Sequence, residues 1–320
     1  MQGHCDGSGH IKVLFVWPYG YETKYLLPLS FAFLKSNLPA DEYRVELADC
    51  SLNNKRATSE WLGERMLAFQ PDVVCVSSWS IVYPEALAVL RVAKKLLPGV
   101  ITIMGGPHVT TSADEVIRHA AVDFVIKGEA EFSFQLLLKT LGDGCGNFND
   151  VPGLVFKSAE GVTSIPVQIA QEIDHVRPPD YGFIDLEEYW KRGYRLNSRH
   201  AKNAPLWVTR GCPYKCSFCS APNLNGRPVR VHSVAFMRVW ILHLYHQFGV
   251  RWFNIIDDNF TFNVEYAKEF CRMVKGLGLD IKFGTPNGIR VQRGDVELWR
   301  LMKDAGWETV IVAPESGSKK

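Results

Sequence analysis

The sequence predicts an α/β protein made of two successive series of alternating strands and helices. Short apolar runs such as residues 11–17 are typical of strands that are buried on both faces of a parallel sheet. Between such runs lie segments whose apolar residues recur at helical spacing, as in residues 59–69. The chain has 320 residues, 47% hydrophobic and 22% charged, which suits about two ordinary globular domains.

The first series predicts a doubly wound parallel sheet of the flavodoxin-like type, because five strands alternate with five helices. We expect strands at residues 11–17, 43–48, 72–77, 100–104 and 122–126. We expect helices at residues 25–38, 59–69, 84–97, 113–120 and 131–141. Such sheets bind ligands beyond the carboxyl ends of their strands. The loops at residues 18–23, 77–83, 105–111 and 127–131 are therefore candidate ligand loops.

A boundary and a linker separate the two series. Residues 142–149 are rich in glycine and asparagine, which indicates a domain boundary. Residues 151–166 predict a β-hairpin, and the proline pair in residues 177–180 predicts a stiff linker. We therefore divide the chain into a first α/β domain at 1–145, a hairpin and linker at 146–203, and the second series at 204–320.

The second series predicts four βα units of a barrel. We expect strands at residues 206–209, 251–256, 281–285 and 309–313, with helices at residues 233–248, 264–277 and 295–305. Four units cannot close a barrel, and an open parallel sheet leaves an unpaired edge. We expect the sequence to be a fragment of a longer protein, the alternative being a partner that supplies the remaining strands.

A loop with three cysteines follows the first strand of this second series. Cys212, Cys216 and Cys219 have the spacing Cys-x3-Cys-x2-Cys. Three thiolates can hold three corners of a [4Fe–4S] cluster and leave one iron open to a reactant. The alternative is a structural zinc site, which needs a fourth ligand, and His232 is the next candidate along the chain.

Polar residues also follow the later strands of this series. They include Asp257 and Asp258 after the second strand, Asn287 and Arg290 after the third, and Glu315 with Ser316 after the fourth. In a βα barrel, the carboxyl ends of the strands form the face on which active sites are built. The alternative is that Asp258 and Glu315, with the residues that follow them, merely cap the next helices.

The cysteine loop, with Phe218 before its last cysteine, resembles the signature of the radical S-adenosylmethionine (SAM) superfamily. The resemblance implies that the cysteines bind a [4Fe–4S] cluster whose fourth iron takes the methionine amine and carboxylate of SAM. An electron from the cluster then cleaves SAM to a 5′-deoxyadenosyl radical. In place of the usual Gly-Gly-Glu, residues 257–261 resemble the subclass with an N-terminal cobalamin-binding domain and a (β/α)6 barrel. The SAM-binding residues implied by the resemblance are Phe218, Asp257, Asp258, Asn287, Arg290, Glu315 and Ser316.

The loops of the first series resemble the cobalamin-binding motifs of the same subclass. Residues 105–110 and 128–131 each follow a strand with a glycine motif, and residues 77–80 are in place to meet the nucleotide tail. Glycine lets a backbone come close to a bulky ligand. The implied cobalamin-binding residues are Tyr19, Ser77, Ser78, Trp79, Gly105, Gly106, Pro107, His108, Gly128 and Glu129.

One departure concerns the lower axial ligand of cobalt. Many cobalamin proteins carry an Asp-x-His-x-x-Gly motif after the first strand, where this chain has residues 17–20, Trp-Pro-Tyr-Gly. We therefore expect cobalamin to bind without a histidine ligand from that loop. His108 belongs to the glycine motif and is not expected to ligate cobalt.

The resemblance predicts a cobalamin-dependent radical SAM enzyme that methylates, rearranges or cyclises an unactivated carbon of a small molecule or natural product. It also implies an electron donor such as flavodoxin or ferredoxin. One alternative is a radical SAM enzyme whose first domain binds no cobalamin. Another is a non-catalytic iron–sulfur partner subunit or fragment. The sequence predicts no individual catalytic residue beyond the cofactor-binding ones.

Composition narrows the setting in which the protein works. A formal net charge of +2 argues against a dedicated nucleic-acid binder. No apolar run approaches the roughly 18 residues of a membrane span, and residues 1–10 do not resemble a signal peptide. The remaining cysteines are scattered without a disulfide framework, which predicts a reducing cytoplasm. These are Cys5, Cys50, Cys75, Cys145 and Cys271.

Overall fold

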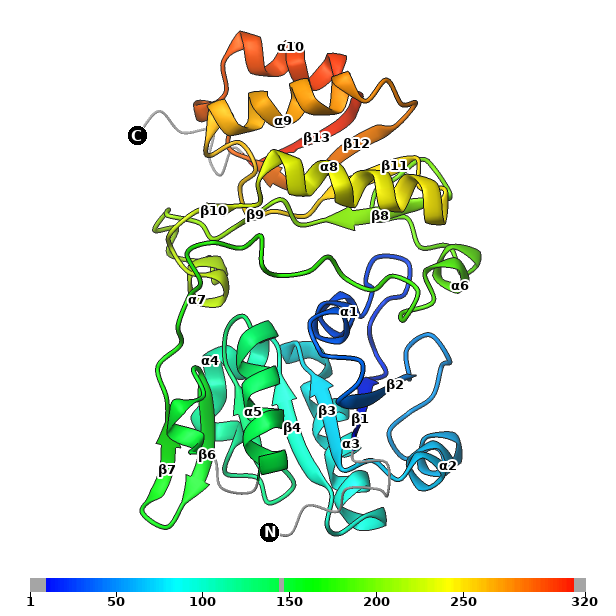
Figure 1. Ribbon diagram of the computed structural model, residues 1–320, viewed down its shortest axis with the longest axis vertical. Coiled ribbons are helices and arrows are strands. Elements are labelled where there is room, and N and C mark those ends of the chain that lie inside the picture. The colour runs from blue at the N-terminus through cyan, green and yellow to red at the C-terminus, as the bar shows by residue number, and fades with distance from the viewer. Residues whose placement is uncertain (1–9, 144–146, 314–320) are drawn as a thin grey trace. The chain divides into compact units, whose positions relative to one another are not determined.

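The computed structural model describes residues 10–143 and 147–313 and contains two compact units. Unit 1 consists of Met1–Ile169 and Val176–Tyr189, and unit 2 consists of Ala170–His175 and Trp190–Lys320. The segment 146–203, which the sequence set apart as hairpin and linker, is thus shared between the units. Each unit has its own main sheet (Figure 1).

Unit 1 is built on a seven-stranded sheet with the order β2-β1-β3-β4-β5-β6-β7. The first five of these strands are parallel, which confirms the predicted doubly wound arrangement. The predicted hairpin pairs antiparallel with β5 and so extends this sheet. The strands are β1 (Ile11–Trp17), β2 (Tyr43–Asp49), β3 (Val73–Ser77), β4 (Ile101–Gly105), β5 (Phe124–Ile126), β6 (Leu154–Ser158) and β7 (Gly161–Ser164).

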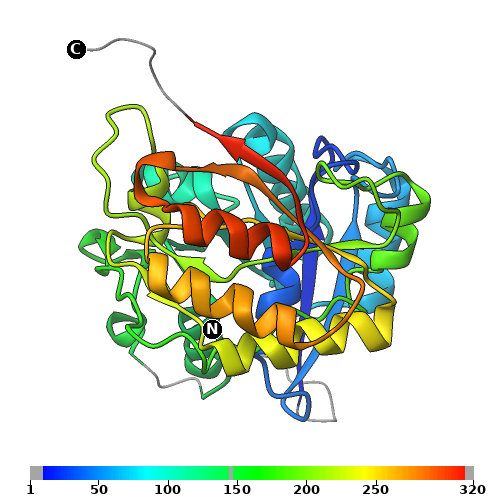
Figure 2. The ribbon, with the colours of Figure 1, turned by 90° about the horizontal axis from the view of Figure 1, so that it is seen from above.

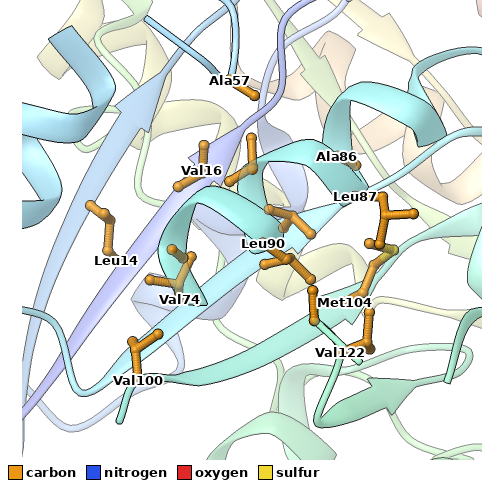
Figure 3. Close-up of a cluster of buried hydrophobic side chains, with 14 of the residues drawn as sticks. Leu14, Val16, Ala57, Val74, Ala86, Leu87, Leu90, Val100, Met104 and Val122 are labelled. Atoms are coloured by element: carbon orange, nitrogen blue, oxygen red, sulfur yellow. The ribbon is translucent and has the colours of Figure 1, made fainter. Parts of the chain in front are cut away.

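Helices cover both faces of this sheet because its central strands are apolar on both sides. One face packs against α2, α3 and α4, and Figure 3 shows Val16, Val74 and Met104 of the strands beside Leu87 and Leu90 of α3. The other face packs against α1 and α5 through a second apolar cluster. The helices are α1 (Leu29–Ser36), α2 (Glu60–Phe69), α3 (Tyr83–Leu96), α4 (Pro107–Val116) and α5 (Glu131–Asp143).

Helix α4 begins earlier than the sequence pattern predicted, at Pro107 and not at residue 113. Gly106 has a φ of +99°, so the chain turns sharply there, and Pro107 then starts the helix with a φ that its ring already fixes. Ser112 departs from helical geometry, with a φ of −133°. The predicted helix at 113–120 is therefore wrong in its bounds, and the glycine motif leads directly into a helix.

Unit 2 contains a parallel four-stranded sheet with the order β13-β12-β11-β8, as expected for a βα series. Its strands are β8 (Asn203–Leu206), β11 (Trp252–Ile255), β12 (Lys282–Ile289) and β13 (Trp307–Val312). Helices α8 (Val234–His243), α9 (Val264–Gly276) and α10 (Val296–Asp304) lie side by side along one face of the sheet (Figure 2). Helix α8 continues as one π-helical turn, Leu244–Phe248.

The first strand of unit 2 also differs from the prediction. Strand β8 ends at Leu206, so the expected strand at 206–209 is misplaced. The chain then leaves the sheet and forms β9 (Thr209–Arg210), which pairs antiparallel with β10 (Arg230–Val231). The cysteine loop and the short helix α7 (Ala221–Asn225) lie between these two strands in sequence. A further short helix, α6 (Leu186–Lys191), was not predicted.

Within residues 10–143 and 147–313, no helix is long and apolar enough to cross a bilayer.

Candidate cofactor sites

The cysteine loop begins where the chain leaves the parallel sheet. The last sheet bond on this side joins the Ile256 amide to the carbonyl of Leu206. The next amides, of Val208 and Thr209, donate instead to the two carboxylate oxygens of Asp257, at 2.7 and 2.8 Å. Asp257 is buried, and burial raises the pKa of its carboxyl group to about 8, although hydrogen bonds from Thr209 and Val208 act in the opposite direction.

The far end of the loop is held by other contacts. The Asn225 side chain donates to Oδ2 of Asp258 at 2.9 Å, and the Asn225 carbonyl accepts from Nη2 of Arg230 at 2.7 Å. The Cys212 amide donates to the Gly226 carbonyl at 3.0 Å. Gly211 has a φ of +90°, and a Cβ atom there would collide with the carbonyl oxygen of Pro228. The loop is therefore closed on itself at its base.

The three loop cysteines offer the donor set that an iron–sulfur cluster needs. Cys212 and Cys216 are half-buried, Cys219 is exposed, and all three are free thiols. Burial raises the pKa of the Cys212 thiol, and the nearby charges of Asp258, Cys219 and Cys216 act in the same direction. All three thiols need to lose their protons to bind iron.

The described part of the chain contains no site for a single metal ion, because no three histidine, cysteine or acidic side chains there lie close enough together to hold one. His232, the candidate fourth zinc ligand, is fully buried and lies 3.1 Å from Oδ1 of Asp174 through its Nδ1 atom. Its ring stacks on Phe236 with a centroid distance of 4.4 Å. These contacts give His232 a role in the interior of unit 2.

Among the described residues predicted to bind SAM, Asn287 and Arg290 lie at the carboxyl end of β12, whereas Phe218 lies in the cysteine loop. Asn287 lies near the carboxyl end of β12, and its side-chain amide donates to the Ile256 carbonyl at 2.6 Å. The guanidinium of Arg290 lies over the ring of Tyr214 in the cysteine loop, 4.1 Å from its centroid. Phe218 is 74% exposed and available for contact. Glu315 and Ser316 lie outside the described residues, and the binding roles of all these residues stay predictions.

Tyr214 is a site residue that the sequence analysis missed. Besides stacking under Arg290, its hydroxyl accepts a hydrogen bond from Nε of Arg293 at 3.1 Å, and its ring meets Phe262 edge-on. Tyr214 therefore joins the cysteine loop to the loops that follow β11 and β12. The sequence feature that could have indicated Tyr214 is its position between Cys212 and Cys216.

The loops of unit 1 meet at the carboxyl end of its sheet and are tied by backbone bonds. The Ser78 amide donates to the Gly105 carbonyl at 2.9 Å, and the His108 amide donates to the Ser78 carbonyl at 3.0 Å. A Cβ atom at Gly106 would lie 2.7 Å from the Ser78 nitrogen and 2.9 Å from Oγ of Ser77. The structure thus brings together residues 77, 78, 105, 106 and 108, which the sequence assigned to one ligand site.

Tyr21 is a second residue that the sequence analysis did not single out. Its buried hydroxyl donates to the Ser77 carbonyl at 3.2 Å and accepts from the Trp79 amide at 3.0 Å. Its ring stacks on Trp17 with a centroid distance of 3.9 Å. Tyr21 therefore fixes the loop after β3, and burial raises the pKa of its hydroxyl.

His108 is held at the start of α4 with one ring nitrogen left over. Its Nδ1 lies 3.0 Å from Oγ of Ser80, and its ring packs on Tyr83. Its Nε2 is shielded from solvent and has no hydrogen-bond partner in the described structure. Burial lowers the pKa of His108, so the ring is neutral near neutral pH. A polar ligand group would satisfy Nε2.

The remaining residues predicted for cobalamin follow β1, β3, β4 and β5. Trp79 is 43% exposed, and the neighbouring Ile81 is 83% exposed, so an apolar surface is open at the loop after β3. The Gly128 amide donates to Oγ1 of Thr110 at 3.1 Å, which links two of the glycine loops. Three further predicted residues are half-buried in the same loops; these are Tyr19, Pro107 and Glu129.

Comparison with known proteins finds a family match within unit 1. Residues 23–138 match the B12 binding domain family. The matched range covers β2 through β5, most of α5 and the loops after β3, β4 and β5. Unit 1 is therefore similar to B12-binding domains over this range.

Curated relatives extend the likeness across most of the chain. An uncharacterised methyltransferase of Pyrococcus horikoshii is 28% identical and covers 92% of this chain and 61% of its own length. The anaerobic magnesium-protoporphyrin IX monomethyl ester cyclase of Cereibacter sphaeroides is 27% identical and covers 81% of this chain and 42% of its own length. The chain thus spans about half the length of the curated relatives it matches.

Solved structures share the fold. The cobalamin-dependent SAM radical enzyme OxsB, with aqua-cobalamin and SAM bound, has a TM-score of 0.81 at 21% identity and covers 97% of this chain and 45% of its own. The radical SAM methyltransferase TsrM of Kitasatospora setae, with cobalamin and a [4Fe–4S] cluster bound, has a TM-score of 0.78 at 18% identity and covers 95% of this chain and 61% of its own. The resemblance stated from the sequence is confirmed: the chain is similar in sequence to methyltransferases and cyclases of this group, and it shares the fold of the solved structures.

Proposed function

We propose that this chain is the cofactor-binding part of a cobalamin-dependent radical SAM enzyme. The observation that carries the proposal is the cysteine loop, in which three free thiols share one closed loop at the carboxyl ends of a parallel sheet. The B12-binding domain in the same chain extends it to a second cofactor. When bound, these groups supply reductive cleavage of SAM and a cobalt centre that carries a methyl group.

Cys212, Cys216 and Cys219 would hold the cluster. Their number leaves one iron of a [4Fe–4S] cluster without a cysteine ligand, which suits a site that admits a reactant. Arg290 and Asn287 would hold SAM, since both lie at the carboxyl end of β12 and contact the cysteine loop or the end of β11. The guanidinium of Arg290 can pair with the methionine carboxylate.

Ser77, Ser78, Gly106 and His108 would hold cobalamin at the carboxyl end of the unit 1 sheet. The orphaned Nε2 of His108 would bond a polar group of the ligand, and the exposed Trp79 and Ile81 would meet the apolar surface of the ring. Nδ1 of the neutral His108 ring already bonds Ser80. We therefore assign its Nε2 a hydrogen bond to the ligand and no contact with cobalt.

The reaction we propose is transfer of a methyl group to an unactivated carbon of a small organic molecule, because relatives named as methyltransferases cover most of the chain. Cyclisation is the second candidate, because the cyclase relatives align over both units. An external electron donor of the flavodoxin or ferredoxin class would reduce the cluster. We also propose a cytoplasmic location, since free thiols such as those of the cysteine loop persist in reducing compartments.

Anaerobic reconstitution of the whole chain tests the proposal. The protein is loaded with iron and sulfide, then with hydroxocobalamin, and desalted. We expect iron–sulfur and corrinoid absorbance to stay with the protein, and SAM with dithionite to give 5′-deoxyadenosine. Retention of the cluster without the corrinoid would support the alternative of a domain that binds no cobalamin. An intact cluster that yields no 5′-deoxyadenosine would support a non-catalytic role for this chain.

A further inference from the structure

The backbone amides of Val208 and Thr209, which precede the cysteine loop, take no partner from the parallel sheet. Val208 and Thr209 are buried, and they follow the point at which the chain stops pairing with β11. A buried amide without a partner is costly, so nearly all such groups in proteins are bonded. Here the partner is a side chain: each oxygen of the Asp257 carboxylate accepts from one of the two amides.

The carboxylate of Asp258, the next residue, accepts a hydrogen bond at the other end of the loop. Asp258 accepts from the side chain of Asn225, the last residue of α7, and Asn225 is bonded from the other side by Arg230. Between these two anchors the chain carries all three cysteines. Consecutive residues at the end of β11 thus contact the chain on both sides of the cysteine loop.

We propose that Asp257 and Asp258 are positioning residues that clamp the two ends of the cysteine loop and so fix the geometry in which its thiolates receive the cluster. The inference rests on the proposed function only in assigning an iron–sulfur cluster to the loop. It gives Asp257 a different role from the SAM contact that the sequence resemblance implied. Both oxygens of this side chain are already engaged in a buried position, and Asn287 and Arg290 remain as the SAM-facing residues of this unit.

Hydrogen exchange on the metal-free chain tests the clamp without any cofactor. In Asp257→Ala, we expect the amides of Val208 and Thr209 to exchange about tenfold faster or more, because both lose their hydrogen-bond acceptor. In Asp257→Asn, one oxygen remains, so we expect one of the two amides to be affected more than the other. The matched control is Asp280→Asn, which removes a carboxylate that is 94% exposed in the same unit.

Cluster retention then tests the consequence. With the cluster loaded, iron loss to a chelator should be roughly 10- to 100-fold faster in both Asp257 variants and in Asp258→Ala than in the wild type, as for other groups that orient metal ligands. Asp258→Ala and Asn225→Ala together should give less than the sum of their separate effects, because both remove the same hydrogen bond. The cluster that remains should bind SAM with wild-type affinity and keep its spectroscopic response to SAM.

Each result separates the clamp from the other possibilities. Unchanged exchange at residues 208 and 209 would overturn the clamp, as would unchanged iron retention combined with weakened SAM binding, which would make Asp257 a SAM contact. If exchange also rises along β12, Asp257 has a general structural role, and the half-exposed Asp258 and Asn225 variants decide the proposal. A wild-type chain that takes up no cluster would remove the proposed function, while the exchange result would still stand.

Discussion

The two units place their candidate sites at the same position of a parallel sheet but hold the site loops by different means. In unit 1, the loops stay close to their strands and bond one another through backbone groups, as Ser78 does with Gly105 and His108. In unit 2, the cysteine loop leaves the sheet. The Asp257 side chain there accepts from the two amides that lack a strand partner, and Asp258 accepts from the Asn225 side chain. The buried amides of a loop that departs from its sheet thus take a side-chain acceptor, whereas the tight glycine turn of unit 1 is bonded largely through its backbone.

Removing a loop cysteine should give the largest difference between the two units in cofactor binding. For Cys216→Ala, we expect complete loss of the [4Fe–4S] absorbance and of 5′-deoxyadenosine formation, because two thiolates cannot hold the cluster in place. Corrinoid binding by unit 1 should be unchanged. Cys271→Ala, which removes a buried thiol of α9, is the control and should keep the cluster. Loss of corrinoid in Cys216→Ala would show that the two sites depend on each other.

Alanine at the two turn glycines should break one site at a time. Gly211→Ala should abolish cluster loading, because the new Cβ meets the Pro228 carbonyl at a φ of +90°. Gly106→Ala should abolish corrinoid retention, because its Cβ meets the Ser78 backbone at a φ of +99°. Backbone strain of this kind costs about 1–3 kcal/mol. Gly161→Ala has a φ of +122° with open space around it, so it tests strain without collision. Equal effects for all three would contradict the collision argument.

Removal of the Tyr21 hydroxyl should have a moderate effect limited to unit 1. Tyr21→Phe deletes bonds to the Ser77 carbonyl and the Trp79 amide, and each is worth about 1 kcal/mol. We expect a lower free energy of unfolding for unit 1 and weaker corrinoid binding, measured by calorimetry and by titration. Tyr25→Phe, at a tyrosine that is 53% exposed, should change neither. Unaltered corrinoid affinity in Tyr21→Phe would show that the loop after β3 does not contact the ligand.

Acid should destabilise unit 2 through a buried lysine that joins α9 to the start of α10. Lys268 contacts Glu265, Asp295 and Glu297, and its hydrogen bonds lower the pKa of Asp295 and of Glu297. Because the folded pKa values are lowered, this stabilisation is present above about pH 4 and is lost as the pH falls through the lowered values.

The melting temperature measured at several pH values checks this expectation. Lys268→Met should melt lower than the wild type at neutral pH and should lose less stability below about pH 4. Lys275→Met is the control, since it removes an exposed pair with Asp304 and should have a smaller effect. Parallel acid curves for wild type and Lys268→Met would contradict the role of this lysine.

The parts of the fold that local patterns predicted are those whose apolar residues repeat regularly. The parallel strands β1 to β5 lie close to their predicted ranges, because continuous apolar runs are sufficient to mark buried strands. Helix α4 was misplaced because Gly-Gly-Pro is typical of a loop, whereas here Gly106 turns the chain at a φ of +99° and Pro107 takes the first helical position. Strand β8 was placed too late because the apolar run continues past Leu206, where pairing with β11 stops.

The candidate sites show the same limit. The three cysteines and the glycine loops are visible as spacing in one stretch of sequence. The roles of Tyr21, Tyr214 and Asp257 depend on bonds to residues distant in sequence, such as that from Val208 to Asp257, and no local pattern records them. Asp257 is predicted to contact SAM on the family resemblance and on its place after a strand, and its burial and its two amide partners appear only in three dimensions.

The assignment of residues 170–175 to unit 2 has a practical consequence for dissecting the protein. This short segment precedes the last part of unit 1 in sequence, yet Arg230 bonds the Ala170 carbonyl, and Asp174 accepts from the Ser233 amide. A fragment that starts at residue 204 would leave these groups of unit 2 without their partners. Because the chain passes from one unit to the other three times, no single cut yields two complete folding units. Studies of either cofactor in isolation therefore require site variants of the intact chain.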